Sequence, residues 1–371
     1  MKRLILLGGG HAHLTVLADL AQRPLDGWDV QLVSPFRRQI YSGMLPGWVA
    51  GHYPLASCAI ALDALADRAK IAFHRTGGVA LDPGVNTLTC ADGKLRNFDV
   101  LSLDIGPAPA LDGLPGGVDY ALPIRPIEGF AAAWPSLLER IAGRSINFHL
   151  VVLGAGAAGL ELAFAIRHRA LQEGWGHLRV SLVGSDVLPL EGASGSARAR
   201  AMRALSRRRI GWHGPRRAVR IREGAIDFAE GDALAFDGCL VATGAAAPAW
   251  LAASGLTTDD RGFVRVGPTL QSTSHQNILA GGDVASSPWP LPKSGVYAVR
   301  AGPVLSENLR AICGGRPPQP WVPQARALYL VSTGDRNALA LWGRWCWEGP
   351  WVWRWKDRID RAFVRRYGTQ A

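Results

Sequence analysis

Apolar and polar residues near the N-terminus alternate in the order strand, turn, helix, strand. An apolar run occupies residues 4–7, glycines fill residues 8–10, a helical spacing of apolar residues covers 13–20, and a second apolar run lies at 30–33. Short apolar runs joined through a helix are typical of parallel strands in a βαβ unit. The pattern therefore predicts an α/β unit with a tight glycine turn.

The same order of elements returns in the middle of the chain. Residues 149–153 form an apolar run, 154–159 a glycine-rich turn, 160–168 a helical pattern and 179–183 another apolar run. Two such units predict an α/β fold with two Rossmann-like domains. The length of 371 residues and the hydrophobic content of 48% agree with more than one buried core.

Weaker patterns fill the rest of the chain. The segment 106–126 is rich in proline and glycine, which predicts a linker between domains. An arginine-rich helix is expected near residues 197–209 and several strands between 211 and 237. Further strands are expected at residues 71–73, 78–81, 87–90, 100–103 and 240–244.

Basic side chains exceed acidic ones and give a formal net charge of +11. Such a surface attracts nucleic acids, acidic lipid headgroups and dinucleotides alike, so the sign alone does not choose a partner. No nucleic-acid recognition motif accompanies the charge, and the arginines at 207–209 are interpreted as a solvated helix end. We therefore expect no nucleic-acid partner.

The turn at residues 154–159 reads Gly-Ala-Gly-Ala-Ala-Gly, follows a strand and opens a helix. In a dinucleotide site the three glycines make the tight turn, let the backbone approach the pyrophosphate and let helix and strand pack closely. The helix N-terminus then faces the phosphates. The first turn keeps two glycines but has His13 in place of the third, so alone it also fits a turn without ligand.

A third motif joins these two turns. Residues 277–280 form an apolar strand that ends in Gly281, Gly282 and Asp283. A carboxylate at this strand end can accept a hydrogen bond from a ribityl hydroxyl, and Gly282 allows close approach of the flavin chain. The three motifs in this order favour a flavin site over ordinary strand-to-turn connections.

The cysteines and histidines show no metal-ligand pattern. The five cysteines have no C-x-x-C spacing, so reduced thiols and a cytoplasmic setting are expected. His11 and His13 are interpreted as residues at a helix start beside the pyrophosphate, and no metal site is expected. The long apolar stretch 146–166 contains Glu161 and spaced glycines, and is interpreted as strand, turn and helix rather than a membrane span.

The order of the two glycine-rich turns, Ala-Thr-Gly at 242–244 and Gly-Gly-Asp at 281–283 resembles the pyridine nucleotide-disulfide oxidoreductase superfamily over essentially the whole chain. The segments 33–35, 41–47 and 292–295 resemble type II NADH dehydrogenases and sulfide:quinone reductases. The paired cysteines of disulfide reductases are absent, and those of sulfide:quinone reductases are not recognisable. The intact second turn therefore argues for a hydride donor at that site.

Within this superfamily, four segments resemble a flavoprotein family that is sometimes fused ahead of selenide, water dikinase. They are Gly-Gly-Gly-His-Ala-His-Leu, Ser-Gly-Met-Leu-Pro-Gly, Leu-Pro-Lys-Ser-Gly-Val-Tyr-Ala-Val-Arg and the segment 355–361. No kinase domain follows in this sequence, so a link to selenium rests on the resemblance alone.

The resemblance implies a glutathione-reductase-like fold that binds FAD and uses NADH or NADPH. It implies a discontinuous FAD-binding domain at 1–112 and 246–315, an NAD(P)H-binding domain with linker at 113–245, and a C-terminal strand and amphipathic-helix segment at 316–371. Motifs and resemblance together give the expected cofactor-binding residues: Gly8, Gly9, Gly10, His11, Ala12, Ser34, Pro35, Ser42, Gly43, Val79, Gly106, Gly154, Gly156, Ala157, Gly159, Glu161, Gly244, Gly282, Asp283, Lys293 and Ser294.

Two of these residues are expected to act in catalysis. The resemblance places Glu161 near the nicotinamide, and the alternative is an acid favoured by the helix dipole. Lys293 precedes a helix expected to begin near Gly295, and the resemblance implies that this segment brings N–H groups and positive charge toward flavin N1 and O2. The alternative for Lys293 is a solvated loop lysine.

The two nucleotide units leave the choice of NADH or NADPH open. The first strand end carries Ser34, and the second carries Gly184 and Ser185, where many sites place a ribose-binding carboxylate.

The C-terminal segment has a tryptophan-rich helical pattern. Trp351, Trp355, Ile359 and Phe363 recur every fourth residue, which predicts one apolar stripe. Such a helix is typical of a membrane interface when cations occupy its other face, and the alternatives are packing on the flavin domain or across a homodimer interface. The cations expected on that face are Arg354, Lys356, Arg358, Arg361, Arg365 and Arg366.

The expected function is an NAD(P)H dehydrogenase that passes electrons through FAD to an acceptor, with a quinone at the membrane surface as the first choice. The expected location is cytoplasmic or peripheral at the inner face of the cell membrane. Two alternatives remain open, namely a soluble reductase acting on a selenium or sulfur species or a protein partner, and a flavin redox sensor with little turnover.

Overall fold

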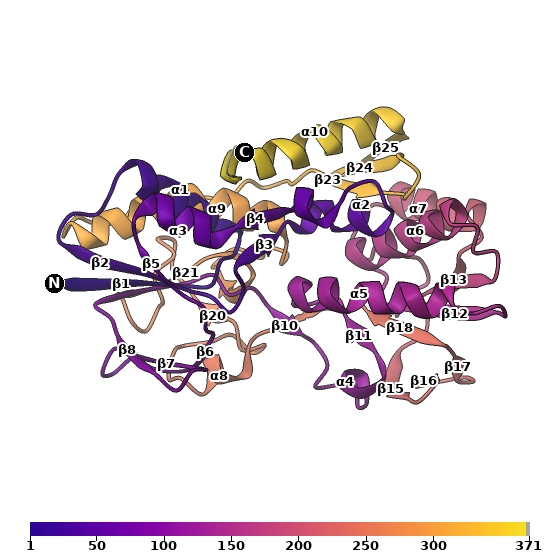
Figure 1. Cartoon of the computed structure of the whole chain (residues 1–371), viewed down its shortest axis with the longest axis horizontal. Helices are drawn as coiled ribbons and strands as arrows, with labels where there is room; N and C mark the ends of the chain where they lie inside the picture. Colours follow the sequence, from indigo (N-terminus) through magenta and orange to yellow (C-terminus); the bar gives the residue numbers. More distant parts are fainter. Residues whose placement is uncertain (369–371) are drawn as a thin grey trace.

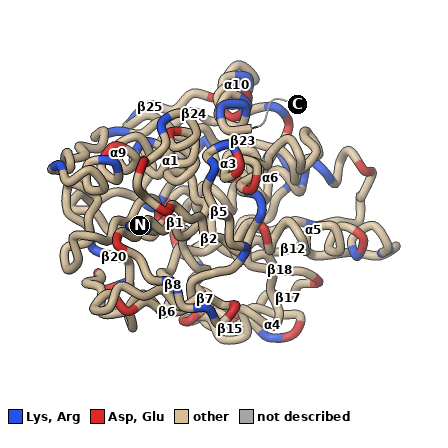
Figure 2. Tube along the Cα trace, turned by 60° about the vertical axis from the view of Figure 1, so that its left-hand side comes forward, with Lys and Arg blue, Asp and Glu red and all other residues tan. Residues whose placement is uncertain are grey.

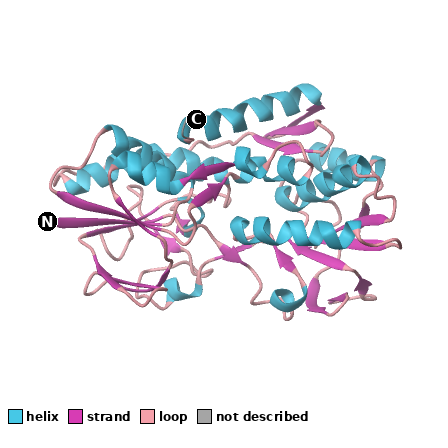
Figure 3. Ribbon diagram, in the orientation of Figure 1, coloured by secondary structure: helices cyan, strands magenta, loops and turns pink. Residues whose placement is uncertain are grey.

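The chain folds into two α/β halves that lie side by side, with a C-terminal segment across one face (Figure 1). The computed structural model describes residues 1–368. Each half contains a five-stranded parallel sheet, and helices and small antiparallel sheets cover its faces (Figure 3). The predicted α/β fold with two Rossmann-like units is therefore confirmed.

The first parallel sheet has the order β21-β9-β1-β2-β5. Its apolar strands are buried on both faces, which is typical of parallel sheets. Helix α1 packs against α3 and α9 on one face, and the antiparallel sheet β6-β7-β8 covers the other (Figure 1). The bounds are β1 Lys2–Leu7, α1 His11–Gln22, β2 Trp28–Val33, α3 Leu62–Ala69, β5 Ala72–His74, β6 Gly78–Asp82, β7 Thr87–Cys90, β8 Leu95–Asn97, β9 Val100–Leu103, β21 Ile278–Ala280 and α9 Gly295–Cys313.

The second parallel sheet has the order β11-β18-β12-β13-β14. Successive side chains of β12 point to opposite faces, so Leu150 and Val152 pack toward the helices while Val151 and Leu153 pack toward the antiparallel sheet β15-β16-β17. The bounds are α4 Gly117–Tyr120, β11 Leu122–Pro123, α5 Ile127–Ala142, β12 Phe148–Leu153, α6 Ala157–Gln172, β13 Leu178–Val183, α7 Gly195–Arg207, β14 Gly211–His213, β15 Ala218–Arg222, β16 Ala225–Phe228, β17 Leu234–Ala235 and β18 Gly238–Val241.

The two halves are joined by two chain crossings that pair with each other. Strand β10 (Ala108–Pro109) runs antiparallel to β19 (Ala245–Ala246). The segment 106–126 is thus only partly a linker, because its residues in β11 already form an edge of the second sheet beside β18. The residue boundaries of the domains stay a prediction, which the position of this crossing supports.

Smaller elements lie between the two sheets and around α9. Strands β3 and β4 pair antiparallel, and β20 pairs with β22. The bounds are β3 Arg38–Ile40, a 3₁₀ turn Ser42–Met44, α2 Leu45–Val49, a 3₁₀ turn Leu55–Cys58, β4 Ala59–Ala61, α8 Ala249–Ala252, β20 Val264–Arg265, a 3₁₀ turn Gly282–Val284 and β22 Ala285–Ser286.

The C-terminal segment is an antiparallel meander followed by a long helix. Strands β23 (Tyr329–Ser332), β24 (Ala338–Trp342) and β25 (Trp345–Gly349) lead into α10 (Pro350–Tyr367). The helix begins with proline at its first turn, where the missing N–H costs no helical hydrogen bond. Its far end reaches the first half, where the Tyr367 and Thr15 hydroxyls are 2.8 Å apart.

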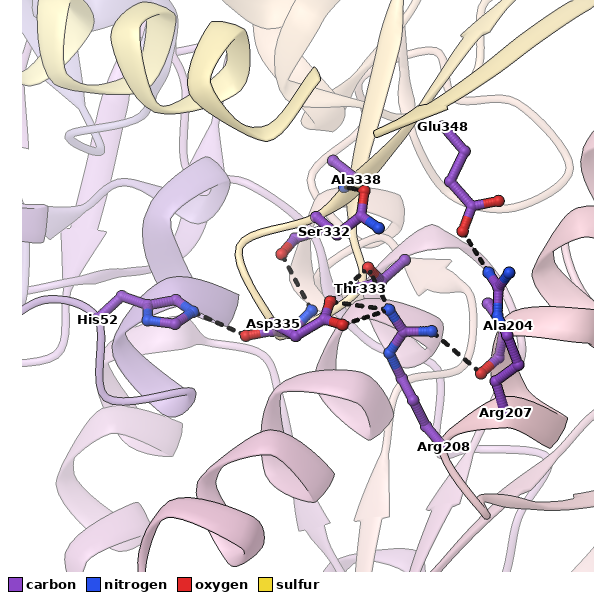
Figure 4. Close-up of polar contacts among 11 residues, drawn as sticks. His52, Ala204, Arg207, Arg208, Ser332, Thr333, Asp335, Ala338 and Glu348 are labelled. Carbon is purple, nitrogen blue, oxygen red and sulfur yellow. Dashed lines mark hydrogen bonds and ion pairs between the residues drawn. The ribbon is translucent and has the colours of Figure 1, made fainter. Parts of the chain in front are cut away.

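Polar contacts fasten the turn between β23 and β24 to both halves (Figure 4). Arg208, just after α7, pairs with Asp335 at 2.7 Å. His52 of the first half lies 2.7 Å from the carbonyl oxygen of Gly334, with its ring nitrogen Nε2 as the partner. The C-terminal segment therefore spans the junction of the two halves.

The apolar stripe predicted for α10 twists from solvent into the interior. Trp351, Trp355 and Ile359 are 48%, 42% and 42% exposed, whereas Phe363 is partly buried and stacks on Tyr41 at a centroid distance of 4.4 Å. At 3.6 residues per turn, a spacing of four residues advances by about 40° each time. A stripe that faces solvent at one end of the helix consequently faces the protein at the other.

The prediction that cations occupy the solvent-facing side of α10 is wrong for Lys356. Lys356 is only 8% exposed and lies on the buried face with Asp360, whereas the five arginines of the prediction are exposed. The spacing of four residues puts Lys356 beside Asp360, and their ion pair of 2.6 Å compensates for the burial of the lysine.

Candidate functional site

The parallel sheets bring the predicted cofactor residues to common edges. In the first sheet Leu7, the last residue of β1, is in register with Val33 and Leu103, and Ala280 is in register with Leu103. The residues that follow these strand ends therefore meet at one edge, as expected for ligand sites in open α/β sheets. They include Gly8, Ser34, Asp104 and Gly281.

The first glycine turn is packed tightly against protein wherever a side chain would point. Gly8 has a φ of +96°, and a Cβ there would lie 2.3 Å from the Asp104 carbonyl oxygen. A Cβ on Gly9 would lie 2.3 Å from Leu62, and one on Gly10 2.3 Å from a carboxylate oxygen of Asp104. Only glycine fits at these positions, because the turn is packed against β9 and α3.

Asp104 is a buried residue at the centre of this turn that the sequence analysis missed. Its carboxylate accepts a hydrogen bond from the backbone N–H of His13 at 2.9 Å and lies 2.5 Å from where a Cβ of Gly282 would be. Burial, with a smaller contribution from the charge of Asp283, raises the pKa of Asp104 to about 7, against the opposing backbone hydrogen bonds of His13 and Ala12. The signal that could have identified Asp104 is its position directly after the strand at 100–103.

The two histidines after the glycines have different roles. His13 turns inward, with Nδ1 2.6 Å from the Gly8 carbonyl oxygen and Nε2 2.8 Å from the Ser102 hydroxyl, so its ring stabilises the turn instead of lying beside a pyrophosphate. His11 faces Tyr41 at a centroid distance of 5.5 Å, and its Nε2 is buried without a hydrogen-bond partner within residues 1–368. Burial lowers the pKa of both histidines to about 4, so both rings are neutral near pH 7.

Gly282 and Asp283 lie next to the first turn. Gly282 has a φ of +67°, and the Asp283 carboxylate lies 3.8 Å from the guanidinium of Arg125. Burial raises the pKa of Asp283, while the charges of Arg125 and Lys293 oppose the shift. Arg125, at the end of the expected linker, was not predicted as a site residue.

The second glycine turn is more open than the first. Cβ atoms on Gly154 and Gly159 would lie 2.5 Å from the Ala242 carbonyl oxygen and 1.8 Å from the Gly154 carbonyl oxygen. Gly156 and Ala157 are exposed at the start of α6, and nothing lies within 4 Å of a Cβ on Gly156 or on Gly244. Two glycines thus keep strand and helix together, and the third leaves room for a ligand at a helix N-terminus.

A cleft of about 1250 Å³ joins the second turn to the first half and the C-terminal segment. The second half contributes Gly154, Gly156, Ala157, Glu161 and Gly244 to its lining, all of them predicted site residues. The first half contributes the predicted Ser42, Gly43, Lys293 and Ser294, and the C-terminal segment contributes Leu330, Val331, Trp342, Lys356, Ile359, Asp360 and Phe363.

Lys293 and Ser294 lie before α9, which begins at Gly295 as expected. The Lys293 ammonium donates to the carbonyl oxygen of Ala285 at 2.5 Å and lies 3.9 Å from the ring centroid of Phe263. Burial lowers the pKa of Lys293 to about 8, and Asp283 opposes the shift. The side chain is therefore held inside the protein and is not a freely solvated loop lysine.

Glu161 points into the cleft beside a buried ion pair. Its carboxylate accepts a hydrogen bond from the Ser332 N–H at 2.7 Å, and burial raises its pKa to about 7 against the opposing charge of Lys356. The Lys356 ammonium donates to the Gly43 carbonyl oxygen at 2.5 Å and to Asp360 at 2.6 Å. The ion pair was not predicted as part of the site, although the spacing of its two residues is a recognisable helical pattern.

Besides Gly8, Gly9, Gly10, His11 and Gly159 of the two glycine turns, five further predicted cofactor residues do not line this cleft or the smaller cavity beside Asp283. Ser34 is buried, and the side chain of Val79 is 46% exposed on β6, so Val79 offers a ligand only its backbone. Gly106 has a φ of +67° with open space around it. The remaining two are Pro35, which is exposed, and Ala12, which is buried in α1.

Buried polar atoms around the cleft are left without protein partners, which suits a polar ligand. Thr243 Oγ1 and Ser294 Oγ are buried and have no hydrogen-bond partner among the described residues, and Arg125 Nη1 has only the Asp283 carboxylate at 3.8 Å, beyond hydrogen-bond distance. Each unpaired buried group costs about 1–3 kcal/mol. Together with His11, these atoms and the two glycine turns fit a pair of dinucleotides better than an empty protein interior.

The chain belongs to the pyridine nucleotide-disulphide oxidoreductase family, whose model matches residues 2–302. It is a flavin oxidoreductase that depends on a pyridine nucleotide, with FAD and NAD(P)H as cofactors. The chain is 23% identical over 346 residues to the demethylphylloquinone reductase NdbB of Synechocystis, with 90% of this chain and 85% of the relative covered.

Solved structures share the fold at low sequence identity. The sulfide:quinone oxidoreductase of Aquifex aeolicus superposes with a TM-score of 0.83 at 16% identity, covering 99% of this chain and 92% of that one. NDH2 from Plasmodium falciparum, solved with NADH, gives a TM-score of 0.81 at 13% identity and covers 100% and 99%. The predicted resemblance to type II NADH dehydrogenases and sulfide:quinone reductases is confirmed.

Three further absences concern residues 1–368. No helix in this part is long and apolar enough to cross a membrane. No group of three or more His, Cys, Asp or Glu side chains there is arranged to hold a metal ion. All five cysteines are free thiols. Burial raises the pKa of Cys58 to about 12.

Proposed function

We propose that this protein oxidises NAD(P)H and delivers the electrons to a quinone at a membrane surface. One observation carries the proposal. The cleft that contains the open glycine turn is also lined by the apolar side chains of Leu330, Val331, Ile359 and Phe363 and by Trp342, which is 39% exposed. A hydrophobic acceptor such as a quinone fits this apolar part of the lining.

The exposed tryptophans support contact with a membrane. Trp345 and Trp347 stack at 6.3 Å on β25, and Trp351 and Trp355 stack at 6.5 Å on α10. Basic positions occur on α10 (Figure 2). Exposed tryptophans flanked by arginines are typical of proteins bound at a lipid interface, where the rings enter the headgroup region and the cations meet acidic lipids. The proposed location is peripheral, at the inner face of the cell membrane.

The residues of the cleft have separate tasks in this function. The open turn at Gly156 and the N-terminus of α6 bind the pyrophosphate of NAD(P)H, and the closed turn at Gly8 holds FAD. Bound FAD supplies the transfer of electrons from the nucleotide to the acceptor. Lys293 and the start of α9 place positive charge and N–H groups near the flavin site.

Glu161 is proposed to handle a proton for the acceptor. Reduction of a quinone consumes protons, and a carboxyl with a pKa of about 7 can hold one at the Glu161 side chain near neutral pH. The Ser332 N–H orients the carboxyl, and the ion pair of Lys356 and Asp360 keeps positive charge near it. Burial raises the pKa of the Cys58 thiol to about 12, which disfavours its reactive thiolate form.

The first test follows the flavin absorbance near 450 nm after anaerobic mixing with NADH or NADPH. Rapid bleaching is expected, and its absence with both nucleotides contradicts the NAD(P)H donor and favours a redox sensor. The acceptor is tested next with anionic phospholipid vesicles that contain a long-chain quinone. The protein is expected to sediment with the vesicles and to reduce the quinone.

The membrane contact is tested with a triple variant, Trp345→Ser, Trp351→Ser and Trp355→Ser, because these side chains are 65%, 48% and 42% exposed. It is expected to lose vesicle binding and quinone reduction while ferricyanide reduction in solution stays unchanged. The control carries Val85→Ser, Val118→Ser and Val322→Ser, which remove exposed apolar side chains elsewhere. Equal vesicle binding by both triple variants contradicts the proposed contact.

A further inference from the structure

The second parallel sheet determines where the adenosine ribose of the nucleotide lies. The glycine turn follows β12, and the neighbouring strands in order are β13 and then β14. In this type of unit the ribose lies over the carboxyl end of the second strand, where a carboxylate binds the hydroxyls of NAD and an arginine accommodates the 2′-phosphate of NADP. The residues after β13 and β14 therefore determine which nucleotide is preferred.

The end of β13 has no free carboxylate. Gly184 follows the strand, and a Cβ there would lie 2.5 Å from Trp212 and 2.8 Å from Ala155, so no side chain fits. Ser185 comes next, is exposed and carries no charge. Asp186 is the first acid, but its carboxylate pairs with Arg198 at 2.7 Å and accepts the N–H of Val187.

Two arginines flank this strand end. Arg216 and Arg217 follow β14 and line the cleft together with Gly184 and Ser185. The backbone N–H of Arg216 donates to the Gly184 carbonyl oxygen at 2.8 Å, which fixes the arginine loop directly beside the end of β13.

The two guanidinium groups differ in how they are held. That of Arg216 stacks 3.9 Å from the ring centroid of Phe228 and donates to the Asp232 carbonyl oxygen. Arg217 is exposed and forms no ion pair within residues 1–368. The Arg216 guanidinium is thus held in place at the cleft, and that of Arg217 is available for a ligand phosphate.

We infer that this site prefers NADPH over NADH, with Arg216 and Arg217 binding the 2′-phosphate; the inference rests on the proposed nucleotide site at Gly154–Gly159. A phosphate monoester carries close to two negative charges near pH 7, and guanidinium groups bind it with paired N–H donors. The hydroxyls of NADH meet no free carboxylate at β13, so they gain no matching partner there. Two acids of the cleft, Asp186 and Glu191, lie on this loop; Asp186 is paired with Arg198, so Glu191 is the one included in the test.

The test measures binding of nucleotide fragments to the FAD-loaded protein by calorimetry. The probes are 2′,5′-ADP, 5′-ADP and inorganic phosphate. We expect 2′,5′-ADP to bind about tenfold or more tightly than 5′-ADP, because guanidinium groups form strong charge-assisted hydrogen bonds with a phosphate. Equal or tighter binding of 5′-ADP overturns the inference, and phosphate that binds as tightly as 2′,5′-ADP shows a general anion site and also overturns it.

Variants separate this inference from the proposed function. Arg217→Ala is expected to lower the affinity for 2′,5′-ADP about tenfold while that for 5′-ADP changes less than about twofold. Arg220→Ala is the control, because Arg220 is exposed on β15 and does not line the cleft. Ser185→Asp is expected to reverse the preference, so that 5′-ADP binds more tightly than 2′,5′-ADP. Glu191→Gln is expected to leave 5′-ADP binding unchanged. If Glu191→Gln weakens 5′-ADP binding, Glu191 is a ribose-binding carboxylate and the inference is overturned.

The ratio of kcat/KM for NADPH and NADH gives a second readout with the same expected order. Failure of both ADP probes to bind, with no flavin bleaching by either nucleotide, refutes the proposed nucleotide site as well. Binding of 5′-ADP alone refutes only the preference for NADPH.

Discussion

The two glycine turns of this protein share a strand–turn–helix geometry but differ in how they meet their surroundings. The turn after β1 is packed against Asp104 and Leu62, so that Cβ atoms at all three glycines would collide with protein. The turn after β12 is tight at Gly154 and Gly159, whereas Gly156 is exposed and has free space around it.

This difference corresponds to two kinds of ligand. A cofactor that stays bound through many turnovers can be enclosed, since its site need not open. A cosubstrate has to enter and leave in every cycle, which requires an accessible turn. The enclosed first turn therefore suits FAD, and the open second turn suits NAD(P)H. The same glycine motif thus serves a permanently bound nucleotide where it is tightly packed and an exchanging nucleotide where it is exposed.

The largest expected effect comes from Gly8→Ala. The added Cβ would lie 2.3 Å from a backbone oxygen and at a φ of +96°, so we expect loss of bound flavin and a destabilisation of more than about 4 kcal/mol. Thermal melts and the flavin-to-protein absorbance ratio measure both. Gly27→Ala is the matched control, because Gly27 has a φ of +78° but no neighbour within 4 Å, and should cost only about 1–2 kcal/mol. A yellow Gly8→Ala protein with unchanged melting contradicts the enclosed turn.

Gly156→Ala tests the open turn. The fold and the bound FAD should be retained because no protein atom lies within 4 Å of the new Cβ. The methyl group occupies the space of the pyrophosphate, so KM for the nucleotide should rise about tenfold. Steady-state kinetics with ferricyanide measure this change, with Gly176→Ala, an exposed glycine outside the cleft, as the control. An unchanged KM contradicts the proposed role of the second turn.

Each of the two turn regions contains a carboxyl group whose pKa is raised to about 7, Glu161 in the open region and Asp104 in the tightly packed one. Glu161 borders the open cleft, and its protonated form is the proposed donor, so quinone reduction should fall as the pH rises through about 7. Glu161→Gln should remove this inflection and slow quinone reduction about tenfold or more. The pH profile of flavin bleaching by the nucleotide should not change. Glu173→Gln, at the other end of α6, is the control, and an inflection that persists in Glu161→Gln refutes the assignment.

Asp104 in the enclosed turn should affect stability instead of turnover. Its pKa is higher in the folded protein than the ordinary value of 3.8, so the folded state binds more protons between about pH 4 and 7. Stability is therefore lost as the pH rises through this window. Asp104→Asn should reduce the drop in melting temperature across the window by roughly 2 °C or more, with the wild-type holoenzyme as reference. An equal drop in both proteins contradicts the assigned pKa.

Local patterns in the sequence were sufficient to predict both turns and the strand before Asp283. Each depends on neighbouring residues, since a strand, a glycine turn and a helix follow one another along the chain. The start of α9 at Gly295 was predicted for the same reason.

Long-range contacts explain what could not be predicted. Asp104 becomes part of the site only because β9 lies beside β1 in the sheet, and Arg125 only because the crossing chain passes near Asp283. Lys356 was expected in solvent, since the sequence defines the helix but not how it rotates against Gly43. The protein interior selects that rotation.

Strand β21 occupies an edge of the first sheet, and this position affects how the protein is made. As the ribosome synthesises the chain from the N-terminus, β1, β2, β5 and β9 emerge well before Ile278–Ala280. A strand added at an edge does not have to insert between strands that are already paired. The nascent chain can therefore pair four strands before the fifth is synthesised. Asp283 and α9 are synthesised only near the end of translation. The proposed flavin site is therefore completed only late in synthesis.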